Sequence, residues 1–233
     1  MSAIRNILAG LALSAVAVQA SAVPVTVNVV GADFNNPVGG VNLNFYNTDG
    51  VAGNEEIRWG TTGGDLSGYR FDASAPPAFT VETDTQFSLG NFTHFNYPIT
   101  ANTAISSVQL DIVTDLTIDG SPISEGPFTF SFLHDETTNG CSPQPSCAND
   151  LINLSNLVSS DTFTVSGQTY TLTLLGFVQN GVFTEFFSTL ENATNTAQLI
   201  ASFSTVNVPE PGTLALLGLG LAGVGISRRR KRA

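Results

Sequence analysis

Hydrophobic and polar residues alternate with a period of two along much of the chain. The clearest case is Phe128, Phe130 and Phe132, which are separated by Thr129 and Ser131. Successive side chains of a strand point to opposite faces of a sheet, so this pattern predicts a strand with one buried face. The same alternation recurs in four other segments: Val25, Val27 and Val29; Val41, Leu43 and Phe45; Tyr170, Leu172 and Leu174; and Leu199, Ala201 and Phe203.

Turn-forming dipeptides separate these segments at short intervals. Asn180-Gly181 is the strongest hairpin sequence, because both residues tolerate the positive φ of a tight turn, and Asp49-Gly50 and Ser166-Gly167 predict further turns. The chain is rich in Thr, Ser, Asn, Gly, Val and Phe, which is typical of β-structure, and it shows no repeat that would indicate a solenoid or propeller. We therefore expect an all-β fold, an antiparallel β-sandwich of jelly-roll type with about eight to twelve strands.

The stretch of residues 87–99 departs from simple alternation. Its apolar residues occupy both phases of the period: Leu89, Phe92, Phe95 and Tyr97. This pattern suits a central strand covered on both faces, with a shift of phase at a bulge beside Gly90. On such a strand Thr93, His94 and Asn96 would be buried polar groups that need partners, and we expect them to form a structural clasp. The catalytic alternative requires a nucleophile and a base-orienting group within hydrogen-bonding distance of His94.

The N-terminal segment has the character of an export signal. Residues 1–22 predict a secretory signal peptide, since they contain a basic residue, an apolar run and a small-residue cleavage site: Arg5, residues 7–18 and Ala20-Ser21-Ala22. The mature chain is expected to begin at Val23, with cleavage after Ala20 as the alternative.

The C-terminal segment has three parts. Pro209 and Pro211 hold the backbone around Glu210 extended, so Val208 to Pro211 form an accessible processing motif. Residues 213–227 carry no charge and would span about 22 Å as a helix, which is short for a bilayer core of about 30 Å. We expect this sorting helix to enter the inner membrane and a basic cluster to stop export there: Arg228, Arg229, Arg230, Lys231 and Arg232.

One passenger domain, residues 23–208, is expected between the signal peptide and the sorting signal of residues 209–233. The passenger keeps only two of the eight basic residues, Arg58 and Arg70, and every acidic residue except Glu210. Such a charge repels nucleic acid and anionic lipid and favours hydration. Binding to nucleic acid is therefore excluded as a function.

The two cysteines of the chain, Cys141 and Cys147, lie close together in the passenger. An exported protein meets an oxidising compartment, so we expect one small-loop disulfide. Zinc binding is the alternative, but His134 is the only nearby histidine and the set of ligands would be incomplete.

Other candidate metal ligands are carboxylates. Asp111, Asp115 and Asp119 recur every four residues, about 13 Å apart on a strand, so they cannot share one ion and should form a solvated face. Neither an EF-hand loop nor a nonapeptide calcium repeat is present. We expect no metal or other cofactor, with a calcium site built by loops as the alternative, for example from Asp33, Asp49 or Asp65.

Two aromatic residues and two arginines lie in or beside the glycine-rich region of residues 53–68. We expect Trp59 and Tyr69 in the core, with Arg58 and Arg70 paired to nearby carboxylates. The alternative is a glycan-binding patch, in which the aromatic rings stack on sugars and the guanidinium groups pair with uronate carboxylates.

The order of Pro-Glu-Pro, apolar segment and basic cluster resembles the PEP-CTERM sorting signal of bacterial exported proteins. With Thr93-His94-Phe95-Asn96 the chain also resembles the THxN family of PEP-CTERM proteins, and residues 57–60, 67–71 and 136–139 are similar to further segments of that family. The resemblance implies Sec-dependent export, removal of the tail by an exosortase, and an association of the β-rich passenger with the cell surface and extracellular polymer. It supplies no catalytic residues.

The sequence thus predicts a non-enzymatic structural or binding protein of the cell surface or extracellular matrix, associated with exopolysaccharide in a biofilm. Two alternatives stay open. A secreted glycan-active hydrolase would need a carboxylate pair, which the number of acids permits, although no Gly-x-Ser-x-Gly motif is present. A calcium-dependent adhesin would be stabilised by its ion.

Overall fold

A computed structural model of the chain describes residues 22–47, 50, 53, 55–137, 149–157, 161–206 and 218. Several predictions fall outside the described residues: the signal peptide apart from Ala22, the pair Cys141 and Cys147, Asp49, the processing motif of residues 208–211 and the basic cluster of residues 228–232. Within the described part of the chain, no helix has the length and apolar character needed to cross a membrane.

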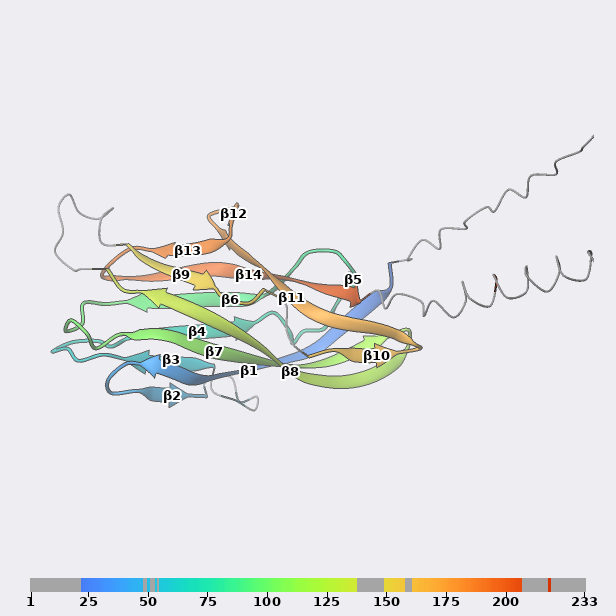
Figure 1. Ribbon diagram of the computed structural model, residues 1–233, viewed down its shortest axis with the longest axis horizontal. Helices are drawn as coiled ribbons and strands as arrows, with labels where there is room; N and C mark the ends of the chain where they lie inside the picture. The colour runs from blue at the N-terminus through green and yellow to red at the C-terminus, as the bar shows by residue number, and fades with distance from the viewer. Residues whose placement is uncertain are drawn as a thin grey trace, which may run out of the picture.

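The described residues form fourteen strands in two antiparallel sheets (Figure 1). Across the first sheet the strands are β13 (Phe186–Thr189), β9 (Asp150–Leu154), β8 (Ser121–Asp135), β7 (Ile105–Ile118), β1 (Pro24–Gly39) and β5 (Phe79–Glu82). Across the second they are β10 (Phe163–Val165), β11 (Gln168–Gln179), β14 (Ala193–Val206), β6 (Phe87–Asn96), β4 (Ser67–Ala73), β3 (Glu56–Trp59) and β2 (Asn44–Tyr46), and β12 (Val182–Thr184) also pairs with β11.

The predicted all-β antiparallel fold is confirmed, whereas jelly-roll topology stays a prediction. The strands outnumber the expected eight to twelve because several are only three or four residues long, such as β2, β10, β12 and β13. Strands this short contain too few residues to show a period-two pattern, so the sequence gives little indication of them.

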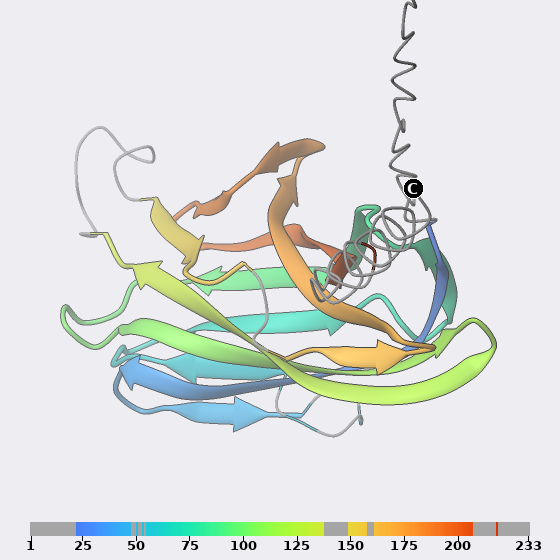
Figure 2. The same ribbon diagram turned by 45° about the vertical axis from the view of Figure 1, so that its right-hand side comes forward.

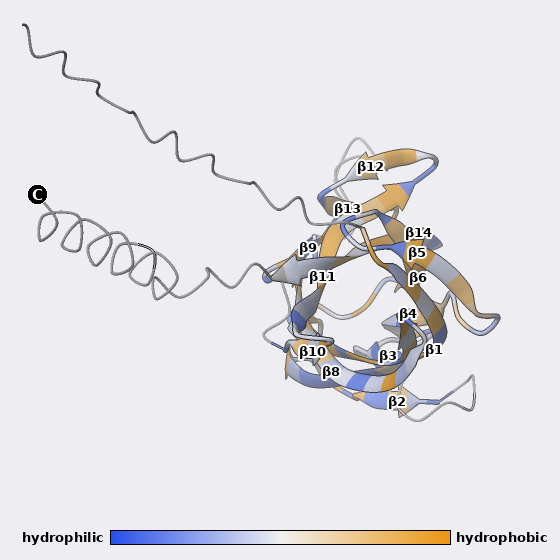
Figure 3. Cartoon of the chain, turned by 90° about the vertical axis from the view of Figure 1, so that its right-hand side faces the viewer, coloured by the Kyte–Doolittle hydropathy of each residue, from blue (hydrophilic) through white to orange (hydrophobic). Residues whose placement is uncertain are grey.

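The two sheets curve around one hydrophobic core, as the view along the strands shows (Figure 3). The long hairpin of β7 and β8 follows the length of the molecule (Figure 2). Phe128, Phe130 and Phe132 on β8 are buried, as their alternation predicts. Phe132 stacks on Phe92 of β6, with ring centroids 4.8 Å apart and planes within 8°, so aromatic packing joins the two sheets at the centre.

Tight turns with positive φ connect three pairs of strands. Asn180-Gly181, with φ of 52° and 78°, joins β11 to β12, and Ser166-Gly167, with φ of 51° and 82°, joins β10 to β11; both were predicted. Asp119-Gly120 makes the corresponding turn between β7 and β8, with φ of 49° and 75°. The sequence analysis did not anticipate this third turn, although its Asp-Gly dipeptide is a favourable hairpin sequence.

Strand β6 lies between β4 and β14, and it contains the predicted bulge. The register between β6 and β14 shifts next to Gly90, where Leu89 is the extra residue. The shift changes which side chains face the core. Before it the inward residues are Phe87 and Leu89, and after it they are Phe92, His94 and Asn96.

The prediction of a buried face is wrong for the segment of residues 41–45. Val41, Leu43 and Phe45 are 41%, 37% and 39% exposed. Only residues 44–46 of this segment form a strand, β2, and it lies at the end of the second sheet, where it pairs with β3 alone. Alternating apolar residues therefore occur here in and just before an edge strand, where few other residues cover them.

Candidate functional site

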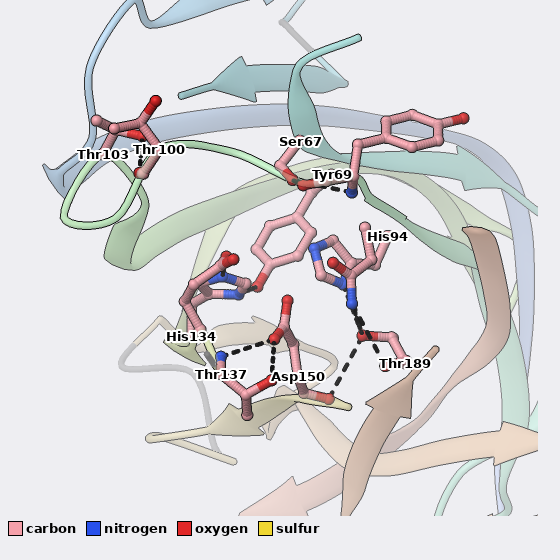
Figure 4. Close-up of polar contacts among 12 residues, drawn as sticks. Ser67, Tyr69, His94, Thr100, Thr103, His134, Thr137, Asp150 and Thr189 are labelled. Carbon is pink, nitrogen blue, oxygen red and sulfur yellow. Dashed lines mark hydrogen bonds and ion pairs between the residues drawn. The ribbon is translucent and has the colours of Figure 1, made fainter. Parts of the chain in front are cut away.

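A set of polar side chains is buried between the two sheets. Tyr69 on β4 and His94 on β6 come from the second sheet, whereas His134 on β8, Asp150 on β9 and Thr189 on β13 come from the first. All five are buried, and four of them have no exposed surface. Their side chains converge on one region between the sheets (Figure 4). We call these five residues the polar cluster.

A tyrosine and a histidine join the sheets by a short hydrogen bond. The Tyr69 hydroxyl lies 2.6 Å from His134 Nδ1, and His134 Nε2 lies 3.1 Å from Glu136 Oε2. Because a carboxylate only accepts, Nε2 carries a proton, and Nδ1 accepts a hydrogen bond from the Tyr69 hydroxyl. Burial, with the charges of Asp150 and Glu136, raises the pKa of Tyr69 well above its usual value, so the phenol stays protonated.

His94 is held by Thr189 from the opposite sheet. His94 Nδ1 lies 2.8 Å from Thr189 Oγ1, and that hydroxyl donates to the Asp150 carbonyl at 3.4 Å. Thr189 therefore accepts from His94 Nδ1–H, which leaves His94 Nε2 with a free lone pair. Nε2 is buried without a hydrogen-bond partner. Burial, with smaller contributions from His134 and Arg58, lowers the pKa of His94 well below its usual value, so the ring is neutral.

Asp150 presents a second acceptor without a donor. Its Oδ1 accepts from the backbone N–H and the hydroxyl of Thr137, at 2.8 and 3.1 Å, whereas Oδ2 is buried without a partner. Burial and the charge of Glu136 raise the pKa of Asp150 to about 6, and burial and the charge of Asp150 raise that of Glu191 to about 7. At neutral pH most Asp150 side chains are therefore ionised in a region that disfavours negative charge.

Two histidines and one aspartate of the cluster form a candidate metal centre. One ligand atom from each of His94, His134 and Asp150 lies within 4.8 Å of the other two. No other such group of three or more His, Cys, Asp or Glu side chains occurs among the described residues, so Asp33 and Asp65 belong to none there.

The Thr-His-x-Asn residues have two orientations on β6. Thr93 Oγ1 lies 3.0 Å from Thr196 Oγ1 of the neighbouring strand β14. Asn96, like His94, reaches Thr189, with Nδ2 at 3.4 Å from both its carbonyl oxygen and its hydroxyl. All three residues are buried and each makes at least one hydrogen bond, but Asn96 Oδ1, like His94 Nε2, has no partner. That their role is structural stays a prediction.

The glycan-binding patch, which was the alternative considered from the sequence, is wrong for its two aromatic residues. Trp59 and Tyr69 have no exposed surface, so a sugar ring cannot stack on either. Trp59 instead packs edge-on against Tyr69, with centroids 4.8 Å apart, and covers the polar cluster. Arg58 pairs with Glu56 at 2.7 Å and Arg70 with Asp72 at 3.0 Å, which agrees with the core interpretation of this region.

Arg58 borders a surface hollow of about 520 Å³. Its guanidinium carbon lies 3.4 Å from the centroid of the Phe95 ring. The side chains that define the hollow are Tyr46, Glu56, Arg58, Asp65, Phe95 and Tyr97. Exposed aromatic and polar groups are therefore present near Arg58, although they are not the ones that the sequence analysis named.

The aspartates of β7 and of the turn that follows it form the predicted solvated face only in part. Asp115 and Asp119 are exposed, and Asp111 is half-buried. Asp111 accepts hydrogen bonds from Asn35 Nδ2 at 2.8 Å and from Thr129 Oγ1 at 2.6 Å, so it contributes to pairing within the first sheet.

Sequence reasoning missed most of the polar cluster. His134 was considered only beside the cysteines, although it continues the inward phase of Phe128, Phe130 and Phe132 and could have been assigned to the core on that basis. Asp150 and Thr189 lie in short strands without a distinctive pattern. No local feature shows that they face His94.

The fold and the chain ends together define the class of this protein: an all-β domain followed by a C-terminal targeting segment. Residues 207–231 match the family described as PEP-CTERM protein-sorting motif. The chain therefore carries a PEP-CTERM sorting signal and is an exported, exosortase-sorted protein whose precursor is anchored in the membrane. A search of curated proteins found no match to the chain, and the resemblance to the THxN family stays a prediction.

Proposed function

We propose that the passenger is a non-enzymatic binding protein of the cell surface or extracellular matrix, and that it recognises neutral polysaccharide at the hollow beside Arg58. The observation that carries this proposal is an aromatic and acidic hollow on the surface of a chain with a sorting signal. Its partners would be the Sec machinery and an exosortase during export, and extracellular polysaccharide afterwards.

The groups around the hollow suit the hydroxyls and apolar faces of sugars. Tyr46 is 45% exposed, and Tyr97 is half-buried with its hydroxyl 3.1 Å from Thr194 Oγ1. Tyrosine rings offer flat apolar faces with a polar edge, and an exposed carboxylate such as that of Asp65 accepts hydrogen bonds from sugar hydroxyls.

The charges favour a neutral polymer over a polyuronate. Arg58 is already engaged by Glu56, by the Leu66 carbonyl at 3.3 Å and by the face of Phe95. Its guanidinium therefore has limited capacity to bind a uronate carboxylate, and the acidic passenger repels a polyanion. A neutral polymer therefore replaces the uronate, whose pairing with the arginines was the alternative considered from the sequence.

Affinity electrophoresis of the purified chain in gels containing a neutral glucan or alginate tests the proposal. We expect retardation by the neutral glucan and about a tenfold loss of affinity in a Tyr46→Ala/Tyr97→Ala variant, equivalent to about 1.4 kcal/mol. Phe183→Ala is the matched control, because Phe183 is an exposed aromatic residue of β12 that does not line the hollow. Equal retardation of the variant and the wild type, or none by any neutral glucan, would overturn the proposal.

The absence of enzymatic activity is part of the same proposal. His94 and Thr189 lie within hydrogen-bonding distance, but His94 donates to the hydroxyl instead of accepting its proton, and both residues are fully buried and out of reach of a polymer. Hydrolysis of a glycoside panel by the wild type, abolished by Glu56→Gln or another single acid-to-amide substitution, would favour the hydrolase alternative instead.

A further inference from the structure

We propose that the polar cluster is a structural binding site for a divalent first-row transition metal ion, with His94, His134 and Asp150 as its ligands. The proposal goes beyond the binding function above and concerns a different part of the molecule. It replaces the expectation from sequence that the passenger has no metal site.

Each of the three residues has one polar atom fixed by the protein and another that faces the cluster. Thr189 binds His94 at Nδ1, so His94 Nε2 faces the cluster. Glu136 binds His134 at Nε2, so His134 Nδ1 faces the cluster, where it accepts from Tyr69. Thr137 binds Asp150 at Oδ1, so Asp150 Oδ2 faces the cluster. Metal-binding histidines characteristically donate their second N–H to a carboxylate, carbonyl or other acceptor, which fixes the ring and its tautomer. The hydrogen bonds that would orient the three ligands of such a site are therefore present.

The unpartnered atoms are both acceptors. His94 Nε2 and Asp150 Oδ2 are fully buried, and neither has a hydrogen-bond donor. Burying such groups without a donor or cation is costly, and a metal ion would satisfy both at once. The ligand atoms lie within 4.8 Å of one another, and tetrahedral zinc requires separations of about 3.3 Å, so the side chains need to move inward by about 1 Å. Binding also requires the Tyr69 hydroxyl to turn its proton away from His134 Nδ1, because that lone pair would bind the ion.

The ligand types favour a transition metal. Two imidazole nitrogens and one carboxylate suit zinc and neighbouring first-row ions, whereas calcium requires six to eight oxygens. Glu136 and Thr137, which hold two of the ligands, also line a surface hollow of about 480 Å³ beside residues 99–102, so these two holding residues border solvent on that side. His94 comes from the second sheet and His134 and Asp150 from the first, so the ion would join the two sheets.

Titration of the metal-stripped full chain with Zn²⁺ alone, followed by calorimetry and by thermal unfolding, tests the site. We expect one ion per chain and a higher Tm that EDTA reverses, because an ion that binds the folded state stabilises it. Asp150→Asn should weaken Zn²⁺ binding at least a hundredfold yet fold, since its amide oxygen can still accept from Thr137. Asp115→Asn, the same change at an exposed position of β7, should bind as the wild type does.

The absorption spectrum of the Co²⁺-loaded chain distinguishes this site from one at the cysteines. We expect ligand-field bands of a nitrogen and oxygen site without thiolate charge transfer, unchanged by Cys141→Ser/Cys147→Ser. The proposal is overturned if the wild type binds no Zn²⁺, if Asp150→Asn binds it equally well, or if the serine variant abolishes binding. The wild-type titration and spectrum decide the matter even if a variant does not fold.

Discussion

At the scale of single residues, the hydrogen bond between Tyr69 and His134 connects the two sheets through groups that water cannot reach. This bond matters to stability mainly because its loss would leave a buried polar atom without a partner. A buried donor or acceptor deprived of its partner costs about 1–3 kcal/mol, whereas the net gain from an ordinary hydrogen bond is nearer 1 kcal/mol.

Tyr69→Phe is therefore expected to lower the free energy of unfolding by about 1–3 kcal/mol, because His134 Nδ1 would remain buried without a donor. Urea denaturation of the full chain in EDTA measures this effect without bound metal. Tyr97→Phe is the control, since its hydroxyl meets Thr194 at the surface, and it should change stability by about 0.5 kcal/mol or less. Similar losses of unfolding free energy in the two variants would show that the bond across the sheets stabilises the protein no more than a surface hydrogen bond does.

At the scale of secondary structure, the bulge in β6 determines which residues reach the core. If β6 were regular and contained no bulge at Leu89, the inward phase of Phe87 would continue on odd-numbered positions, and His94 and Asn96 would face outward. The bulge is thus the local feature that delivers His94 to the polar cluster. Gly90 permits it, because the backbone and the Phe71 ring approach closely there.

Gly90→Ala should destabilise the protein by about 1–3 kcal/mol through overpacking. A Cβ atom at this position would lie 2.5 Å from Phe71 Cζ and 2.6 Å from the Asp72 carbonyl oxygen. Gly63→Ala is the control, because nothing lies within 4 Å of its Cβ and its φ is not positive, so stability should change little. Chemical denaturation compares the two, and a tolerated Gly90→Ala would show that the bulge can relax.

At the scale of the whole molecule, the chain combines an acidic β-domain with a sorting segment that follows its last strand. Strand β14 ends at Val206, and the sorting motif begins at residue 207. Because the domain is complete before the motif starts, we expect the tail to be removed without disturbing the two sheets.

The intact mass of the protein from membrane and extracellular fractions of the producing cells tests this expectation. The extracellular form should begin at Val23 and end near Pro209, and the membrane-bound precursor should retain the basic cluster. Glu210→Ala should shift the protein toward the membrane fraction, since it alters the processing motif. An extracellular form that still contains residues 228–232 would show that release does not require removal of the tail.

The sequence by itself determined the features that depend on neighbouring residues. Period-two alternation identified the inward faces of β8, β11 and β14, and dipeptides able to adopt positive φ identified two of the hairpin turns. The irregular phase around Gly90 indicated the bulge. The sorting motif can likewise be read from the sequence alone, because it is defined by the order of prolines, apolar residues and basic residues along the chain. Each of these features is local, so no knowledge of the fold was required.

Only the tertiary structure decided what the buried polar residues do. Tyr69 and His134 are 65 residues apart in the chain, and His94 and Thr189 are 95 apart. Periodicity shows that a side chain points inward but not which strand lies opposite, because that depends on the order of strands and the packing of two sheets. The same packing buried Trp59 and Tyr69, which removed them from the surface, and brought His94, His134 and Asp150 together.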